Sequence, residues 1–272
     1  MKSVAAAQWA ITDYQGRSAE ELFKRTAEAK RALGNKVMVL GHNYQRDEVI
    51  EHADFRGDSL LLAKLAAQHA DRPSIIFCGV HFMAETAEIL SRSNQTVILP
   101  DMAAGCSMAD MAAIEQVDEC WDELGRILPV EETVLPAVYV NSAAVLKAFC
   151  GEHGGITCTS SNARAVIEWA WARREKILFF PDEHLGRNTA NKMGLPREQM
   201  IVWDPFLPNG GNSAEAIRKA RLILWKGHCS VHQMFQPAHV DYFRKQHPGI
   251  KVIVHPECHE NVVNKADFVG ST

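Results

Sequence analysis

The sequence predicts an α/β fold of three pseudo-symmetric three-layer αβα domains, with short parallel sheets around a central site and the third domain incomplete in this chain. Short, continuous apolar runs alternate with helical patterns, which favours βαβ units whose sheets are buried on both faces. The order of these runs occurs twice in full and then begins a third time. Polar residues follow the strands at equivalent places, so we expect one shared site beyond their carboxyl ends.

The predicted strands define the three copies. The first copy holds strands near residues 36–40, 74–78 and 96–99, and a short segment that ends in Gly57-Asp58-Ser59. The second holds strands near 137–140, 156–158, 176–180 and 222–225, and the third begins with 251–254 and 266–269. We therefore expect a first αβα domain with an N-terminal helix at residues 1–113, a second at 114–235, and the start of a third at 236–272.

Helical patterns lie between the strands. Ser18 and Glu21 have the spacing of a capping box, and they predict a helix over residues 18–33 that covers one sheet. Further helices are expected near residues 60–68, 83–90, 143–149, 163–173 and 214–220. Residues 204–213 are rich in Pro and Gly and predict a loop.

Composition narrows the possible partners. The formal net charge is −4 and there is no long basic run, so nucleic acid and anionic membranes are poor candidates. No signal-peptide pattern or membrane-length apolar stretch is visible, which predicts a cytoplasmic protein with small-molecule ligands. The phosphate-loop, dinucleotide-binding, zinc-protease and hydrolase-elbow motifs are also missing from the sequence.

Two of the seven cysteines stand in special positions. Cys106 and Cys229 each follow a strand and a glycine and precede a serine, at equivalent places in the repeat. A free cysteine is more often an inert buried side chain, which is how we interpret Cys78, Cys120 and Cys150, and also Cys158. One thiolate from each copy could hold three irons of a 4Fe-4S cluster and leave the fourth iron open. By analogy, a third cysteine is expected beyond Thr272.

Zinc is the competing metal. Its candidate ligands cluster late in the chain, but their spacings match no common zinc pattern: His228, Cys229, His232, His255, Cys258 and His259.

Serine and threonine residues recur at predicted helix starts. Ser59, Ser160 or Ser161, and Ser271 or Thr272 precede helical segments or the place where one should begin. Each could be an ordinary N-cap, but their repetition favours binding of several carboxylate or phosphate groups.

Titratable side chains at the strand ends are candidates for proton transfer. His42, His232, His255 and Glu257 have the appropriate chemistry, because imidazole titrates near neutral pH and a buried carboxylate can be tuned. Tyr44 and Tyr139 could orient a substrate oxygen or donate a proton to a leaving hydroxyl, although Tyr139 could equally be a packed aromatic.

Ten segments together resemble the quinolinate synthase family. They occur in order from about residue 36 to the end: Gly41-His42-Asn43-Tyr44-Gln45, Gly57-Asp58-Ser59-Leu60, Gly79-Val80-His81-Phe82-Met83-Ala84-Glu85-Thr86-Ala87, Pro100-Asp101 to Cys106-Ser107, Tyr139-Val140-Asn141, Thr159-Ser160-Ser161-Asn162-Ala163, Pro181-Asp182-Glu183-His184-Leu185-Gly186-Arg187, Trp225-Lys226-Gly227-His228-Cys229, His255-Pro256-Glu257-Cys258 and Val269-Gly270-Ser271-Thr272.

The resemblance implies three pseudo-symmetric domains around a 4Fe-4S cluster held by three cysteines. It implies a transferase that condenses iminosuccinate with dihydroxyacetone phosphate and dehydrates the product to quinolinate, in the pyridine nucleotide branch of NAD biosynthesis, with a possible functional link to an L-aspartate oxidase. The family's cluster ligands fall on Cys106 and Cys229, and its third has no counterpart here. Its iminosuccinate contacts fall on His42, Ser59, Tyr139, Val140, Asn141, Ser160, His255, Pro256, Glu257 and Thr272. Its catalytic tyrosine falls on Tyr44, and a further active-site histidine on His232.

Two alternatives stay open at the level of sequence. A different iron-sulfur hydro-lyase on the same scaffold would dehydrate a hydroxy acid without the triose phosphate. A small-molecule-binding α/β protein or inactive remnant would need no chemistry at all.

Overall fold

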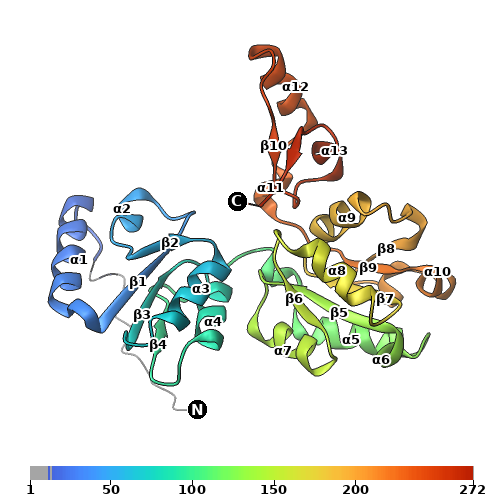
Figure 1. The fold of residues 1–272 in the computed structure, drawn as a ribbon, viewed down its shortest axis with the longest axis horizontal. Helices are drawn as coiled ribbons and strands as arrows, with labels where there is room; N and C mark the ends of the chain where they lie inside the picture. Colours follow the sequence, from blue (N-terminus) through green and yellow to red (C-terminus); the bar gives the residue numbers. More distant parts are fainter. Residues whose placement is uncertain (1–11, 13, 272) are drawn as a thin grey trace.

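The computed structural model describes residue 12 and residues 14–271 of the chain. Within this part, the strands form a four-stranded sheet in the order β2-β1-β3-β4, a five-stranded sheet in the order β6-β5-β7-β9-β8 and the two-stranded sheet β10-β11. Every strand pair in the described ladders is parallel. The three sheets form three separate groups in Figure 1. The predicted α/β class with short parallel sheets is confirmed.

The first sheet carries helices on both sides. Its strands are β1 (Val37–His42), β2 (Phe55–Gly57), β3 (Ser74–Cys78) and β4 (Thr96–Ile98), and its helices are α1 (Ala19–Leu33), α2 (Asp47–Ile50), α3 (Ser59–Gln68) and α4 (His81–Leu90). The core on the α3 and α4 side contains Leu40, Phe77 and Leu62. Ser18 caps α1 as predicted, since its Oγ accepts from the Glu21 N–H at 3.1 Å. An apolar cavity of about 430 Å³ remains between α1 and β1.

The second sheet is the largest and the most deeply buried. Its strands are β5 (Val134–Tyr139), β6 (Ile156–Cys158), β7 (Lys176–Phe180), β8 (Met200–Trp203) and β9 (Leu222–Trp225). Its helices are α5 (Ile114–Gly125), α6 (Val130–Thr133), α7 (Ala144–Glu152), α8 (Ala163–Trp171), α9 (Glu183–Lys192) and α10 (Ala214–Lys219). All residues of β5 and β7 are buried, as expected for strands covered on both faces.

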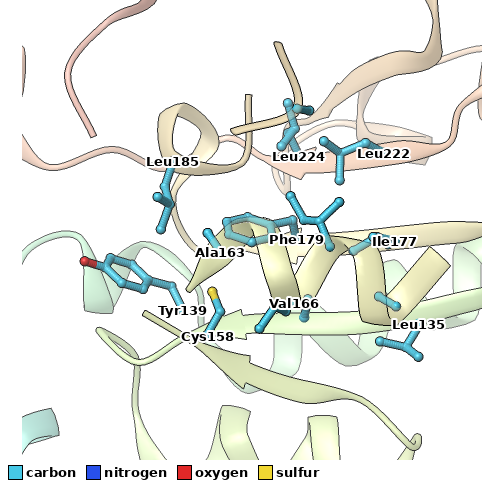
Figure 2. Close-up of a cluster of buried hydrophobic side chains, with 14 of the residues drawn as sticks. Leu135, Tyr139, Cys158, Ala163, Val166, Ile177, Phe179, Leu185, Leu222 and Leu224 are labelled. Carbon is cyan, nitrogen blue, oxygen red and sulfur yellow. The ribbon is translucent and has the colours of Figure 1, made fainter. Parts of the chain in front are cut away.

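One face of this sheet packs against α8 and α9. Figure 2 shows Ile177, Phe179 and Leu224 packed with Val166 of α8 and Leu185 of α9. Tyr139 stands at the edge of this cluster with its hydroxyl pointing away from the other labelled side chains (Figure 2). Tyr139, the last residue of β5, therefore has its ring in the core and its hydroxyl at the carboxyl edge of the sheet.

The third sheet is small. Its strands β10 (Ile253–Val254) and β11 (Phe268–Val269) are shorter than predicted, and α11 (Ser230–Gln233), α12 (Pro237–Gln246) and α13 (Glu260–Val263) accompany them. Val262 and Val263 pack beneath the strands, whereas Ile253 and Phe268 are 68% and 57% exposed. None of the helices in the described part of the chain combines the length and apolarity that crossing a membrane would need.

The strand order supports the predicted repeat. In each of the two larger sheets the first strand lies between the second and third, and β10 pairs with β11 in the same relation. β8 is an extra edge strand that the sequence analysis did not predict. Helices α5 and α12 were not predicted either. The domain limits near residues 113 and 235 remain predictions.

Candidate active site

A cavity of about 260 Å³ lies where the carboxyl ends of strands from all three sheets meet. Its walls include nine of the polar or strand-end residues singled out from the sequence: His42, Tyr44, Ser59, Tyr139, Val140, Asn141, Ser160, His255 and Ser271. Residues from separate copies of the repeat thus line one cavity, as the strand-end rule predicts.

The local folds explain how these side chains reach the cavity. His42 is the last residue of β1, and Ser59 is the first residue of α3, whose N-cap is Asp58. Asn141 follows β5. Ser160 lies between β6 and α8, and its Oγ is 2.9 Å from the Oγ of Ser271, which follows β11. The loops that follow β6 and β11 are therefore in direct contact at the cavity.

A hydrogen-bonded network centred on Glu257 lies beside this cavity. Tyr139 OH donates to Glu257 Oε1 at 2.6 Å, and His232 Nδ1 lies 2.9 Å from Glu257 Oε2. The His255 ring stacks on the His232 ring, with centroids 4.6 Å apart. Glu257 is only 3% exposed, so its charge depends on these partners.

The surroundings of Glu257, His232 and His255 shift the pKa values of these three groups. Burial would raise the pKa of Glu257, but the hydrogen bond from His232 and the nearby His255 outweigh it and lower that pKa. Burial would lower the pKa of His232, but hydrogen bonds with Cys229 and Glu257 raise it to about 10. Burial lowers the pKa of His255. At neutral pH the site therefore holds a carboxylate, a protonated imidazole and a neutral imidazole.

His42 and Tyr44, at and just after the end of β1, are part of the cavity wall. Their rings lie 4.1 Å apart, and the Tyr44 N–H donates to His42 Nδ1 at 3.2 Å. Burial lowers the pKa of His42, with the charge of Asp58 opposing it. Tyr44 is 68% exposed and lines the cavity.

The two singled-out cysteines lie on neighbouring loops. Cys106 follows β4, and Cys229 follows β9 as the N-cap of α11. The residues after them touch, because Ser107 Oγ and Ser230 Oγ are 3.1 Å apart. Both thiols are free and half-buried, and both pack against the same core cluster. Burial raises the pKa of Cys106, and the charges of Cys229 and Glu257 add to it.

A second metal-binding possibility shares one of these thiols. Ligand atoms of Cys229, His232 and Glu257 lie within 4.8 Å of one another. Of the zinc ligands considered from the sequence, this group within the described residues includes only Cys229 and His232.

Pro256 and Glu257, both predicted contacts, are not among the residues that line the main cavity. Pro256 lines a neighbouring cavity of about 140 Å³ that shares Ser160 and Ser161 with the first. Thr272 falls outside the described residues.

Sequence reasoning missed two buried polar residues. Asp182 is fully buried at the start of α9, where its Oδ1 accepts from the Leu185 N–H at 2.6 Å. Burial, followed by the charge of Glu257, raises its pKa. Asn188 lies in the same helix and contacts the segment around Glu257. An aspartate between a strand and a helix is a recognisable N-cap signal, but nothing in the sequence indicates the partners of Asn188.

The fold and the site together define an α/β enzyme with an acid–base network beside a pair of free thiols. A model of the family described as "Quinolinate synthetase A protein" matches residues 24–272. Proteins named quinolinate synthase from Rhodopirellula baltica, Herpetosiphon aurantiacus and Corynebacterium glutamicum are 56%, 55% and 54% identical to the chain. The alignments cover 96%, 100% and 96% of this chain, and 69%, 72% and 66% of those proteins. The chain therefore belongs to the quinolinate synthetase A family, and it is an enzyme.

Proposed function

We propose that the chain condenses iminosuccinate with dihydroxyacetone phosphate to form quinolinate, releasing phosphate and water, as a step of NAD biosynthesis. The observation that carries this proposal is the cavity at the strand ends, where the buried Tyr139–Glu257–His232 network adjoins the loops of Cys106 and Cys229. The functional link to an L-aspartate oxidase belongs to the same proposal, because oxidation of the aspartate amine yields iminosuccinate.

The cavity suits a substrate with two carboxylates. The N-terminal ends of α3 and α8 approach it beside Ser59 and Ser160, and helix starts favour anions because of their free N–H groups and partial positive charge. The side chains of His42 and Asn141 add neutral polar contacts. These features support binding of iminosuccinate between the first and second sheets, with His255 closing the third side.

The network suits the proton transfers of such a condensation. A proton must leave the methylene carbon of iminosuccinate, and protons must reach the oxygens lost as water. The lowered pKa of Glu257 keeps it a carboxylate at neutral pH, the state that can accept a proton, and the pKa of His232 of about 10 keeps it protonated, the state that can donate one. Tyr44, which lines the cavity, can donate to a departing hydroxyl.

The thiols of Cys106 and Cys229 are suited to be two of the ligands of a 4Fe-4S cluster. They are free, half-buried and on touching loops, and thiolates are the preferred ligands of such clusters. Cys106 and Cys229 would hold the cluster. When bound, its open iron would supply a Lewis acid for loss of a hydroxyl.

The test is quinolinate formation by protein reconstituted anaerobically with iron and sulfide. We expect quinolinate only when both iminosuccinate and dihydroxyacetone phosphate are present, and none from protein left without iron. Consumption of a hydroxy acid without the triose phosphate would instead indicate a hydro-lyase. Iron-loaded protein that binds the substrates without turnover would indicate a binding protein, and either result would overturn the proposal.

A further inference from the structure

Asn188 holds the segment that carries Glu257. It lies in the middle of α9 and is 2% exposed. Its Nδ2 donates to the carbonyl oxygens of Pro256 at 2.7 Å and Cys258 at 2.8 Å, the residues on either side of Glu257. Because both partners are acceptors, only the amide nitrogen of Asn188 can occupy this position.

The segment around Glu257 needs such support because it has no helix or strand of its own. Residues 255–258 form a turn between β10 and α13. Within the turn, the Cys258 N–H donates to His255 O at 3.0 Å, which closes the turn but does not attach it to the second sheet. The two bonds from Asn188 tie its backbone to α9, whose own start is fixed by Asp182.

We propose that Asn188 is a positioning residue, which holds Glu257 where its two oxygens meet Tyr139 and His232. This inference rests on the proposed function, since it assigns Glu257 a part in the condensation. The contacts of Glu257 are 2.6 and 2.9 Å long, so a shift of about 1 Å in its backbone would stretch both beyond hydrogen-bonding distance. A displacement of about 1 Å in a catalytic group can cost about a hundredfold in rate.

The test compares Asn188→Asp and Asn188→Ala with a matched control. Aspartate has the same shape, but its carboxylate accepts hydrogen bonds and would face two carbonyl oxygens. Asn191→Ala is the control, because Asn191 is an exposed residue of the same helix whose Nδ2 lies 3.4 Å from Glu260 Oε2, outside the Glu257 turn. Two quantities are measured: hydrogen exchange of the backbone amides of His255, Glu257 and Cys258 in the protein before reconstitution, and kcat and KM of the reconstituted protein per bound iron.

We expect both Asn188 variants to exchange faster at 255–258 and to lose about tenfold or more in kcat, with a smaller change in KM. Asn191→Ala should match the wild type in both measurements. Unchanged exchange at 255–258, faster exchange spread over the whole chain, or an unchanged kcat beside faster local exchange would each overturn the positioning role. If the wild type makes no quinolinate, the proposed function fails separately, and the exchange result still decides whether Asn188 holds the turn.

Discussion

At the scale of single residues, the site combines side chains that sequence could nominate with contacts that it could not. His232 and Glu257 were predicted as candidates for proton transfer from the chemistry of their side chains. The bond from Tyr139 to Glu257 spans 118 residues of sequence, and no local pattern encodes it. Asn188 was missed for the same reason, because its role depends on a turn that folds back onto α9.

The two proposed cluster ligands can be tested one residue at a time. Cys106→Ala and Cys229→Ala should each lose most of the iron bound after anaerobic reconstitution, since each removes a thiolate ligand. Cys78→Ala is the matched control, because Cys78 is also a free, half-buried thiol but lies on β3, facing the cavity beneath α1. Iron and sulfide analysis is the measurement. Full iron content in either of the first two variants would contradict the assignment.

Lys147 gives a prediction of pH-dependent stability. Burial lowers its pKa to about 8, with Glu85 opposing the shift, and its ammonium donates to Ser142 O. Between about pH 8 and 10.5 the unfolded chain holds this proton and the folded protein does not, so the lysine's contribution to stability rises with pH. Below pH 8 the buried charge costs up to about 3 kcal/mol.

Replacing Lys147 with methionine should remove this dependence. Denaturant unfolding at pH 7.5 and pH 10 would measure it, with the difference between wild type and Lys147→Met isolating the lysine from other titrating groups. We expect the wild type to gain stability relative to the variant as the pH rises. A difference that stays constant with pH would contradict the shifted pKa.

At the scale of elements, the long apolar runs were the most predictable parts of the fold. Strands β5 and β7 are buried along their whole length, so they are continuous apolar segments in the sequence. β8 was missed because it is a short edge strand just before a loop rich in Pro and Gly. α12 was missed because it buries only Val240 and so has little apolar periodicity.

A hydrogen bond between α4, which packs on the first sheet, and α7, which packs on the second, can be tested by its effect on stability. Glu85 of α4 accepts the Ala144 N–H at 2.8 Å, at the start of α7, so the first unit caps a helix of the second. Glu85→Ala should lower the free energy of unfolding by about 1 kcal/mol, since it removes a cap. Glu85→Gln retains an acceptor and should lose less. Equal midpoints for Glu85→Ala and wild type in urea would show that this contact contributes nothing.

At the scale of the whole molecule, the repeat predicted that the ends of strands from three sheets would share one cavity, and they do. It could not predict how the copies contact one another. Those contacts come from individual side chains, such as Trp225, whose Nε1 donates to Met111 O, and Arg197, whose Nη1 lies 2.9 Å from Glu260 Oε1. Neither pairing follows from periodicity or propensity.

Under the proposed function, Glu257, in the turn after β10, acts in one site with residues that follow strands of the first two sheets. The most direct measurement is kcat for quinolinate formation by Glu257→Gln at wild-type iron content, beside Glu260→Gln as control. Glu260 lies three positions on, at the start of α13, and pairs with Arg197. We predict that Glu257→Gln retains its iron and loses turnover by about a hundredfold or more, while Glu260→Gln remains active. Normal quinolinate formation by iron-loaded Glu257→Gln would show that Glu257 has no part in the reaction.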